Sequence, residues 1–122
     1  MVLKKLIVFA LACSFLVVNV TVAQKSKHTF KLGTNDFILD KEPFQIISGE
    51  LYPARIPAEY WLHRILMVKA MGCNTVTADV FWNYQESEED VFDFSTTNHN
   101  LARFIQLVQQ EEMWLILKPG PY

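Results

Sequence analysis

Two charged residues that close apolar stretches are best placed to do chemistry. Asp79 falls near the end of the run NTVTADVFW, and Lys118 ends the run WLILK. Successive side chains of a strand point to opposite faces, so Asp79 lies away from the aliphatic face formed by Val76, Ala78 and Val80. If the two runs are neighbouring parallel strands, we expect an ion pair or a water-bridged contact between Asp79 and Lys118, which would offset the cost of burying a lone carboxylate. The alternative is that Asp79 simply reaches solvent at the strand end.

The residues after Asp79 carry groups suited to a sugar. The run FWNYQE offers the rings of Trp82 and Tyr84 for stacking, and Asn83 and Glu86 for hydrogen bonds to hydroxyl groups. Any one of these aromatic residues could equally be part of a core. Together, in one loop after a strand, they favour a polyol or sugar site. The loop after the preceding strand adds three side chains suited to the same place: Glu50, Tyr52 and Arg55.

Other chemistry finds less support in the residue pattern. Retaining glycoside hydrolysis needs two carboxyl groups about 5–5.5 Å apart, and neither Glu50 nor Asp79 lies in a pattern that marks an acid or a nucleophile. Ser48 does not lie in a nucleophile elbow, and Cys73 precedes a strand at the end opposite the sugar-suited loops. The histidines lack the spacing of metal ligands: His28, His63 and His99. We therefore assign no catalytic residue, and we expect no metal and no cofactor.

Two amphipathic helices are predicted between the strands. In IPAEYWLHRILMVKAMG, Pro57 suits the first turn, Gly72 suits the C-terminal cap, and Trp61, Ile65 and Val68 form an apolar stripe. The second helix is expected to open at Asn98. Its apolar face contains Leu101, Phe104, Ile105 and Val108.

The strands are expected on both sides of these helices. Short strands are predicted near Phe30–Leu32 and Phe37–Leu39, and longer ones over Phe44–Gly49, NTVTADVFW and Trp114–Lys118, with an acidic loop at Glu86–Asp90. Strands joined by helical crossovers should be parallel and right-handed. The class is therefore α/β. A doubly wound sheet and a (β/α)₈ barrel both begin this way, but SGELYPARIP lacks a G-x-G-x-x-G fingerprint, which favours the barrel.

The amino-terminal residues have the pattern of an export signal. Lys4 and Lys5 precede a long apolar run, and Thr21 and Ala23 occupy the small-residue positions before a cleavage site, so residues 1–23 are predicted to be a signal peptide. The alternatives are a retained membrane anchor and lipidation of Cys13. We expect a periplasmic or extracellular protein with no stable membrane span after cleavage.

The charge and cysteine content of the mature chain argue against nucleic acid as a partner and against an intramolecular disulfide. Signal removal takes away two lysines and no acidic residue, so the formal charge changes from -2 to -4. No basic run remains, so nucleic acid is not an expected partner. Cys73 would be the only cysteine, which leaves no intramolecular disulfide.

A set of short motifs resembles the start of family 35 glycoside hydrolases, the β-galactosidase family. They are Ser48-Gly49, Arg55-x-Pro57, Tyr60-Trp61, Gly72-x-Asn74, Trp82-Asn83, Phe92-Asp93-Phe94 and Pro119-Gly120-Pro121-Tyr122. The resemblance covers roughly residues 37–122. It implies a retaining enzyme that removes terminal β-linked galactose from oligosaccharides and glycans, so a carbohydrate is the expected partner.

The resemblance also implies how the chain is divided. Residues 1–23 would be the signal, 24–36 a polar lead with a first short strand, and 37–122 the amino-terminal part of a catalytic (β/α)₈ barrel, with about three of eight strands and two helices. The family's acid/base glutamate follows the fourth strand and its nucleophile the seventh. Both would lie beyond Tyr122, so the chain is expected to be a fragment truncated after the third barrel strand. The positions expected to contact substrate are Glu50, Asp79, Trp82, Asn83 and Tyr122.

Several residues depart from the family pattern. Asp79 stands where the family usually has a tyrosine that touches galactose, and Lys118 stands for an arginine. The other departures are Tyr52 and Gln85 for histidines, Ser87 for a proline and Glu112 for a glycine. They leave two alternatives open: a barrel glycosidase for a different sugar, and a non-catalytic remnant or weak sugar-binding module.

Overall fold

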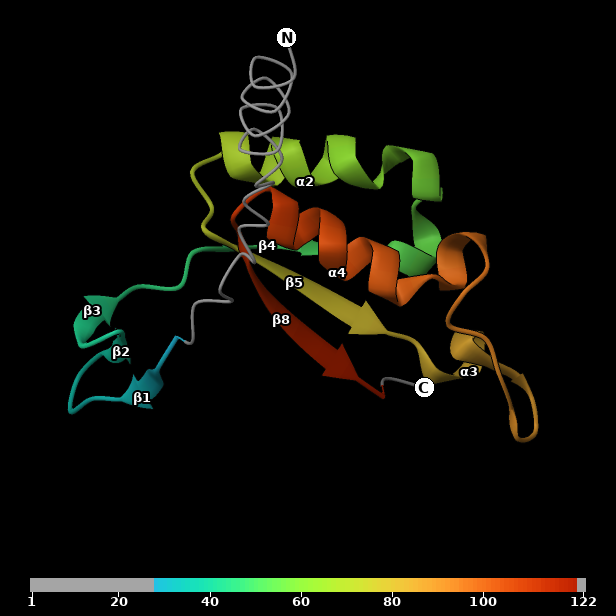
Figure 1. The fold of residues 1–122 in the computed structure, drawn as a ribbon, viewed down its shortest axis with the longest axis horizontal. Coiled ribbons are helices and arrows are strands. Elements are labelled where there is room, and N and C mark those ends of the chain that lie inside the picture. The colour runs from blue at the N-terminus through green and yellow to red at the C-terminus, as the bar shows by residue number, and fades with distance from the viewer. Residues whose placement is uncertain (1–27, 121–122) are drawn as a thin grey trace, which may run out of the picture.

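Three parallel strands with two helices on one face form the centre of the molecule. The structure is a computed structural model that describes residues 28–120. The strands β4 (Ser48–Leu51), β5 (Thr75–Val80) and β8 (Trp114–Pro119) lie in the order β4-β5-β8. Both pairs are parallel, as predicted. The helices α2 (Trp61–Ala70) and α4 (Leu101–Gln110) lie side by side over one face of this sheet (Figure 1).

The core lies between that sheet face and the two helices. The predicted helix stripes supply most of it: Trp61, Ile65, Val68, Phe104 and Val108 are all buried. Leu107, which the predicted face of the second helix omitted, is buried as well. From the sheet, the core receives Leu51, Val76 and Ala78, with Leu115 and Leu117 packed against it. Alternation along β5 and β8 places these residues together on the helix-covered face.

Two 3-10 turns and an asparagine fix how the chain enters α2. The turn η1 (Pro53–Arg55) precedes η2 (Ala58–Tyr60), which leads directly into α2. Asn98 accepts a hydrogen bond from the Ala58 amide at 2.9 Å and donates one to the Ile56 carbonyl at 2.9 Å. The prediction that Asn98 opens the second helix is therefore wrong. Asn98 lies in η3 (Thr97–His99), and Asn100 caps α4 by accepting from the Arg103 amide at 2.9 Å.

Both helices end in the same hydrogen-bonded motif. After α2, Gly72 has φ +85°, its amide donates to the Lys69 carbonyl, and the Cys73 amide donates to the Val68 carbonyl. This is the left-handed C-terminal cap that Gly72 predicted. After α4, Glu112 takes the equivalent place with φ +55°. The same two bonds run from Glu112 to Gln109 and from Met113 to Val108.

A small antiparallel sheet lies near the amino ends of the parallel strands (Figure 1). It contains β1 (Phe30–Leu32), β2 (Phe37–Leu39) and β3 (Glu42–Phe44) in sequence order, and the first two match the prediction. The continuous strand predicted over 44–49 is wrong, because the chain changes sheets between β3 and β4. The Asn74 side chain holds this crossing by accepting from the Ile47 amide at 3.0 Å and donating to the Gln45 carbonyl at 2.7 Å.

The acidic segment after β5 is more ordered than the predicted loop. A single helical turn, α3 (Trp82–Gln85), leads into a hairpin of β6 (Glu86–Glu88) and β7 (Val91–Phe92). The Asp90 amide donates to Glu86 Oε1 at 2.9 Å, which stabilises the turn. Glu86 thus has a structural contact in the hairpin, and its hydroxyl-binding role stays a prediction. None of the helices within residues 28–120 combines the length and apolar character needed to cross a membrane.

Candidate functional site

Three charged side chains converge at the carboxyl ends of the parallel strands. Glu50 lies on β4, Asp79 on β5 and Lys118 on β8, and Asp79 is the direct register partner of Lys118. Alternation along β5 puts Asp79 on the face opposite the buried Val76 and Ala78. The three groups therefore lie on the sheet face away from the helices. Glu50 belongs to the strand itself, one residue beyond the predicted strand end.

Lys118 bridges the two carboxylates. Its Nζ lies 2.7 Å from Asp79 Oδ1 and 2.5 Å from Glu50 Oε1. The ion pair predicted between Asp79 and Lys118 is confirmed, while the contact with Glu50 was not foreseen. The Asp79 side chain is only 14% exposed, against 43% for Glu50 and 47% for Lys118. Asp79 is thus the inner member of the group, and Glu50 and Lys118 reach solvent.

The contacts also set the protonation states at this site. Hydrogen bonds from Lys118 and then from Tyr52 lower the pKa of Glu50. The bond to Glu50 raises the pKa of Tyr52, and those to Asp79 and Glu50 raise the pKa of Lys118. A general acid needs a carboxyl whose pKa is raised. Glu50 is instead held ionised, so it suits hydrogen bonding to a ligand better than proton donation. We call Glu50, Tyr52, Asp79 and Lys118 the carboxyl-end cluster.

The aromatic segment after Asp79 lies at the same end of the sheet. Trp82 is 42% exposed and its ring meets that of Phe92 edge-on, with centroids 5.5 Å apart. Asn83 is exposed and borders a hollow of about 340 Å³. Tyr84 also lines this hollow, but one face of its ring stacks on His99 at 4.0 Å between centroids. Tyr122, the fifth expected contact residue, lies outside the described residues, as does the predicted signal peptide.

One arrangement at this end was missed in the sequence. The Arg55 guanidinium lies over two rings, with Cζ 5.3 Å from the Tyr52 centroid and 4.8 Å from that of Phe81. Arg55 and Tyr52 were expected near this end, but Phe81 was not singled out. The available signal was alternation: Phe81 directly follows β5, two residues after Asp79, so its side chain would be expected on the same side of the chain as Asp79.

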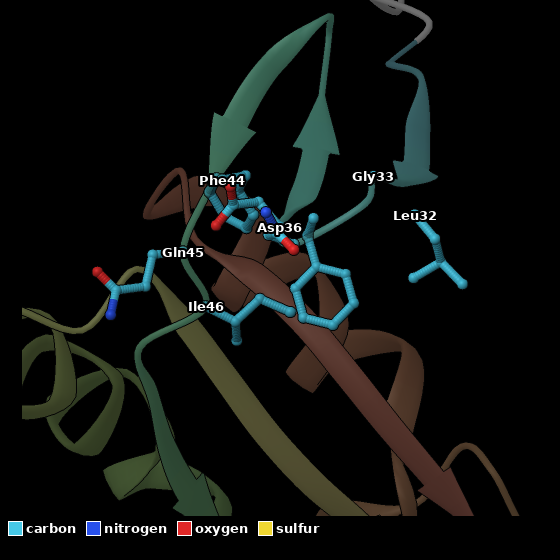
Figure 2. A pocket seen from close by; sticks show the side chains of 8 residues that line it. Leu32, Gly33, Asp36, Phe44, Gln45 and Ile46 are labelled. Carbon is cyan, nitrogen blue, oxygen red and sulfur yellow. The ribbon is translucent and has the colours of Figure 1, made fainter.

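A larger hollow, of about 610 Å³, lies at the opposite end of the molecule. Figure 2 shows it between the β1–β3 sheet, with Leu32, Asp36 and Phe44, and the connecting residues Gln45 and Ile46. Its lining contains a single carboxylate and lies far along the strands from the carboxyl-end cluster. Nor does any group of histidine, cysteine or acidic residues within 28–120 have the arrangement of a metal site.

Comparisons with known proteins identify the family. The family model described as "Glycosyl hydrolases family 35" matches residues 36–122. The chain belongs to this family. It is 39% identical over 94 residues to a beta-galactosidase of Xanthomonas manihotis, and 42% identical over 87 residues to human beta-galactosidase-1-like protein 2. It is also 40% identical over 89 residues to a beta-1,2-glucosyltransferase of Ignavibacterium album.

The matches cover most of this family 35 chain and a small share of its relatives. They span 77%, 71% and 70% of the chain, but only 16%, 14% and 12% of the three relatives. The chain therefore corresponds to a short part of each of these longer proteins.

Proposed function

We propose that residues 37–120 form the first three strands of a (β/α)₈ catalytic barrel, with the carboxyl-end cluster on its substrate side. The observation that carries this is the convergence of Glu50, Asp79 and Lys118 on the helix-free face, at the carboxyl ends of three adjacent parallel strands. Barrel enzymes hold their active sites at this end, and in a barrel the helix-free face lines the interior.

The reaction we propose is hydrolysis of terminal β-galactosides with retention of configuration. Family membership and the beta-galactosidases among the relatives support this substrate class. Glu50 and Asp79 are both ion-paired with Lys118, so the acid/base and nucleophile carboxylates would come from later strands of the complete barrel. The described residues would bind sugar hydroxyls through Glu50, Asp79 and Asn83, with Trp82 available for ring stacking.

A different sugar is the second candidate, and the carboxyl-end cluster itself favours it. An acidic Asp79 paired with Lys118 presents charged hydrogen-bonding groups, which select hydroxyl positions differently from an aromatic side chain. A relative named beta-1,2-glucosyltransferase is 40% identical to the chain, close to the 39% of the Xanthomonas manihotis beta-galactosidase.

The test is a substrate panel on two proteins. One is the 122-residue chain, and the other is the product of the reading frame continued past the Tyr122 codon. We expect the continued product to release 4-nitrophenol from 4-nitrophenyl β-galactoside with retention of the anomeric configuration. The 122-residue chain should release none. Faster turnover of a β-glucoside or β-xyloside would favour the second candidate. If the frame encodes no later glutamates, or neither protein turns over, the hydrolase proposal fails and sugar binding is what remains.

Variants of the continued product locate the site. Asp79→Asn should lower kcat/KM by about 10- to 100-fold, because hydrogen bonds to a charged group contribute about 1.5–3 kcal/mol. Asp36→Asn, in an exposed turn at the opposite end, is the matched control and should leave kcat/KM unchanged. Equal losses in both variants would contradict the proposed position of the site.

We further propose that residues 1–23 direct export and are removed. Amino-terminal sequencing of the protein from the periplasm or medium should then begin at Gln24. A chain that starts at Met1 and stays with the membrane would support the retained anchor instead.

A further inference from the structure

The Arg55 guanidinium lies over two neighbouring aromatic rings. Its Cζ lies over the Tyr52 and Phe81 rings, whose centroids are 5.8 Å apart. Among residues 28–120, its side chain forms no ion pair and no hydrogen bond. Stacking uses the face of the guanidinium, so the N–H groups in its plane remain available to an acceptor.

Arg55 lines the hollow of about 340 Å³, a volume near the lower limit of small-molecule sites. Ala54, Phe81, Asn83 and Tyr84 complete its lining. The Asn83 amide and Tyr84 hydroxyl can both donate hydrogen bonds. The Tyr84 ring is held by its stack on His99, with an interplanar angle of 3°. This lining contains one cation, two neutral donor groups and no carboxylate.

Two features hold Arg55 in this position. It ends η1, where its backbone amide donates to the Tyr52 carbonyl at 2.9 Å, and Pro53 restricts the first turn. Phe81 is 8% exposed, so one of the two rings under the guanidinium is fixed in the packed structure. The acidic groups of the carboxyl-end cluster, Glu50 and Asp79, are both engaged by Lys118. Lys118 offsets part of their negative charge, which reduces their repulsion of an anion at Arg55.

We propose that Arg55, Asn83 and Tyr84 form a binding site for an oxyanion. A carboxylate in the guanidinium plane would accept two parallel N–H bonds from Arg55, and a sulfate could accept the same pair. The site takes the acidic substituent of a glycan, either a uronate carboxylate or a sulfate ester, next to the proposed sugar site. That last step rests on the proposed function, whereas anion binding itself does not.

The test is a titration of the 122-residue chain followed by NMR of the arginine side-chain N–H groups. The probes are sodium glucuronate and sodium sulfate. Sodium chloride is the control for ionic strength, and glucose is the control for the sugar ring. We expect saturable shifts of the Arg55 signals with glucuronate, sulfate or both, and none with chloride or glucose. Glucuronate alone would identify the ligand as a planar carboxylate, and sulfate alone would identify it as a sulfate ester.

Three variants decide whether Arg55 is responsible. Arg55→Gln should weaken binding at least about ten-fold, since it removes the charged donor. Arg55→Lys keeps the charge but loses the fork, and should weaken glucuronate more than sulfate. Arg103→Gln, on the exposed side of α4, is the matched control.

The outcomes that overturn the proposal are equally specific. Shifts that grow linearly with every salt, or equal losses in the Arg55 and Arg103 variants, would show charge screening without a site. Amide spectra check that each variant folds. The titration measures binding and no turnover. Anion binding at Arg55 could therefore be found even if the chain belongs to no hydrolase, and hydrolase activity could be found without anion binding.

Discussion

At the scale of single residues, Lys118 decides the character of the carboxyl-end cluster. One ammonium group contacts both Glu50 and Asp79. Two carboxylates that share one cation avoid the mutual repulsion that would otherwise raise the pKa of one of them. The site therefore holds the ionised Glu50 close to Asp79, an arrangement suited to accepting hydrogen bonds from hydroxyl groups.

The pH dependence of this contact follows from the two shifts. Glu50 has a lowered pKa, so its contribution to stability is present above its ordinary value of 4.5 and is lost as pH falls through the lowered value. Lys118 has a raised pKa, so its contribution is present below 10.5 and is lost as pH rises through the raised value. The contact should thus stabilise the fold across neutral pH.

Lys118→Met should move the Glu50 titration to higher pH, because the ammonium that favours its ionised form is removed. Carboxyl carbon NMR across the acid range measures this directly. Lys31→Met, on the exposed strand β1, is the control and should leave Glu50 unchanged. A Glu50 titration that is the same in Lys118→Met and wild type would show that the contact does not persist in solution.

At the scale of elements, the two helix ends form a natural comparison. Gly72 and Glu112 occupy the same left-handed position of the same motif, with φ +85° and +55°. A residue with a Cβ in this region is strained by about 1–2 kcal/mol, and glycine is not. The helix end before β8 therefore carries a cost that the end before β5 avoids.

Glu112→Gly should raise the free energy of unfolding by about 0.5–1 kcal/mol, the relief of strain being reduced by the greater freedom of glycine in the unfolded chain. Gly72→Ala should lower it by about 1–2 kcal/mol, with no steric contribution because nothing lies within 4 Å of the added Cβ. Urea denaturation measures both. The two changes in the free energy of unfolding should have opposite signs. A Glu112→Gly variant less stable than wild type would contradict the shared motif.

The contact between β4 and α2 depends on the absence of a side chain at Gly49. A Cβ there would lie 2.6 Å from Cγ1 of Val68, so the strand and helix could not keep their present distance. Gly49→Ala should cost about 1–3 kcal/mol in the free energy of unfolding. Val68→Ala removes the obstructing methyl groups, and the double variant should be more stable than the sum of the single effects by over about 0.5 kcal/mol. Strict additivity would show that the clash is relieved elsewhere.

At the scale of the whole molecule, the helices cover one face of the sheet. Within residues 28–120, the other face is covered only near its amino end, where His28 and Phe44 contact Trp114. The helices bury Val76 and Ala78, whereas Trp114 and Ile116 on the opposite face are 36% and 37% exposed. In the described residues, β4 and β8 are the edge strands of the sheet. An open apolar face with free edges favours association between copies.

We expect the 122-residue chain to self-associate with rising concentration in sedimentation velocity experiments. Ile116→Lys should shift it toward the monomer, because a charged side chain on the open face opposes both face and edge contacts. Leu62→Lys, on the exposed side of α2, is the control and should have little effect. A wild-type chain that stays monomeric at every concentration would show that this face does not mediate self-association.

Much of the element pattern could be read from the sequence because it depends on local periodicity. The spacing of Trp61, Ile65 and Val68 determined the buried side of α2, and alternation in NTVTADVFW determined the buried side of β5. Parity together with parallel order was enough to predict the contact between Asp79 and Lys118. The errors fell at Asn98 and in residues 44–49, where hydrogen bonds between distant segments replaced the local preference.

Sequence by itself determined the α/β order, the two faces of each element and the family motifs, since each is encoded in residues close along the chain. Tertiary structure decided that Glu50 shares Lys118 with Asp79 and that Arg55 lies over Tyr52 and Phe81. These contacts join residues from different strands and loops. They depend on register and on the distance between elements, which local patterns leave open.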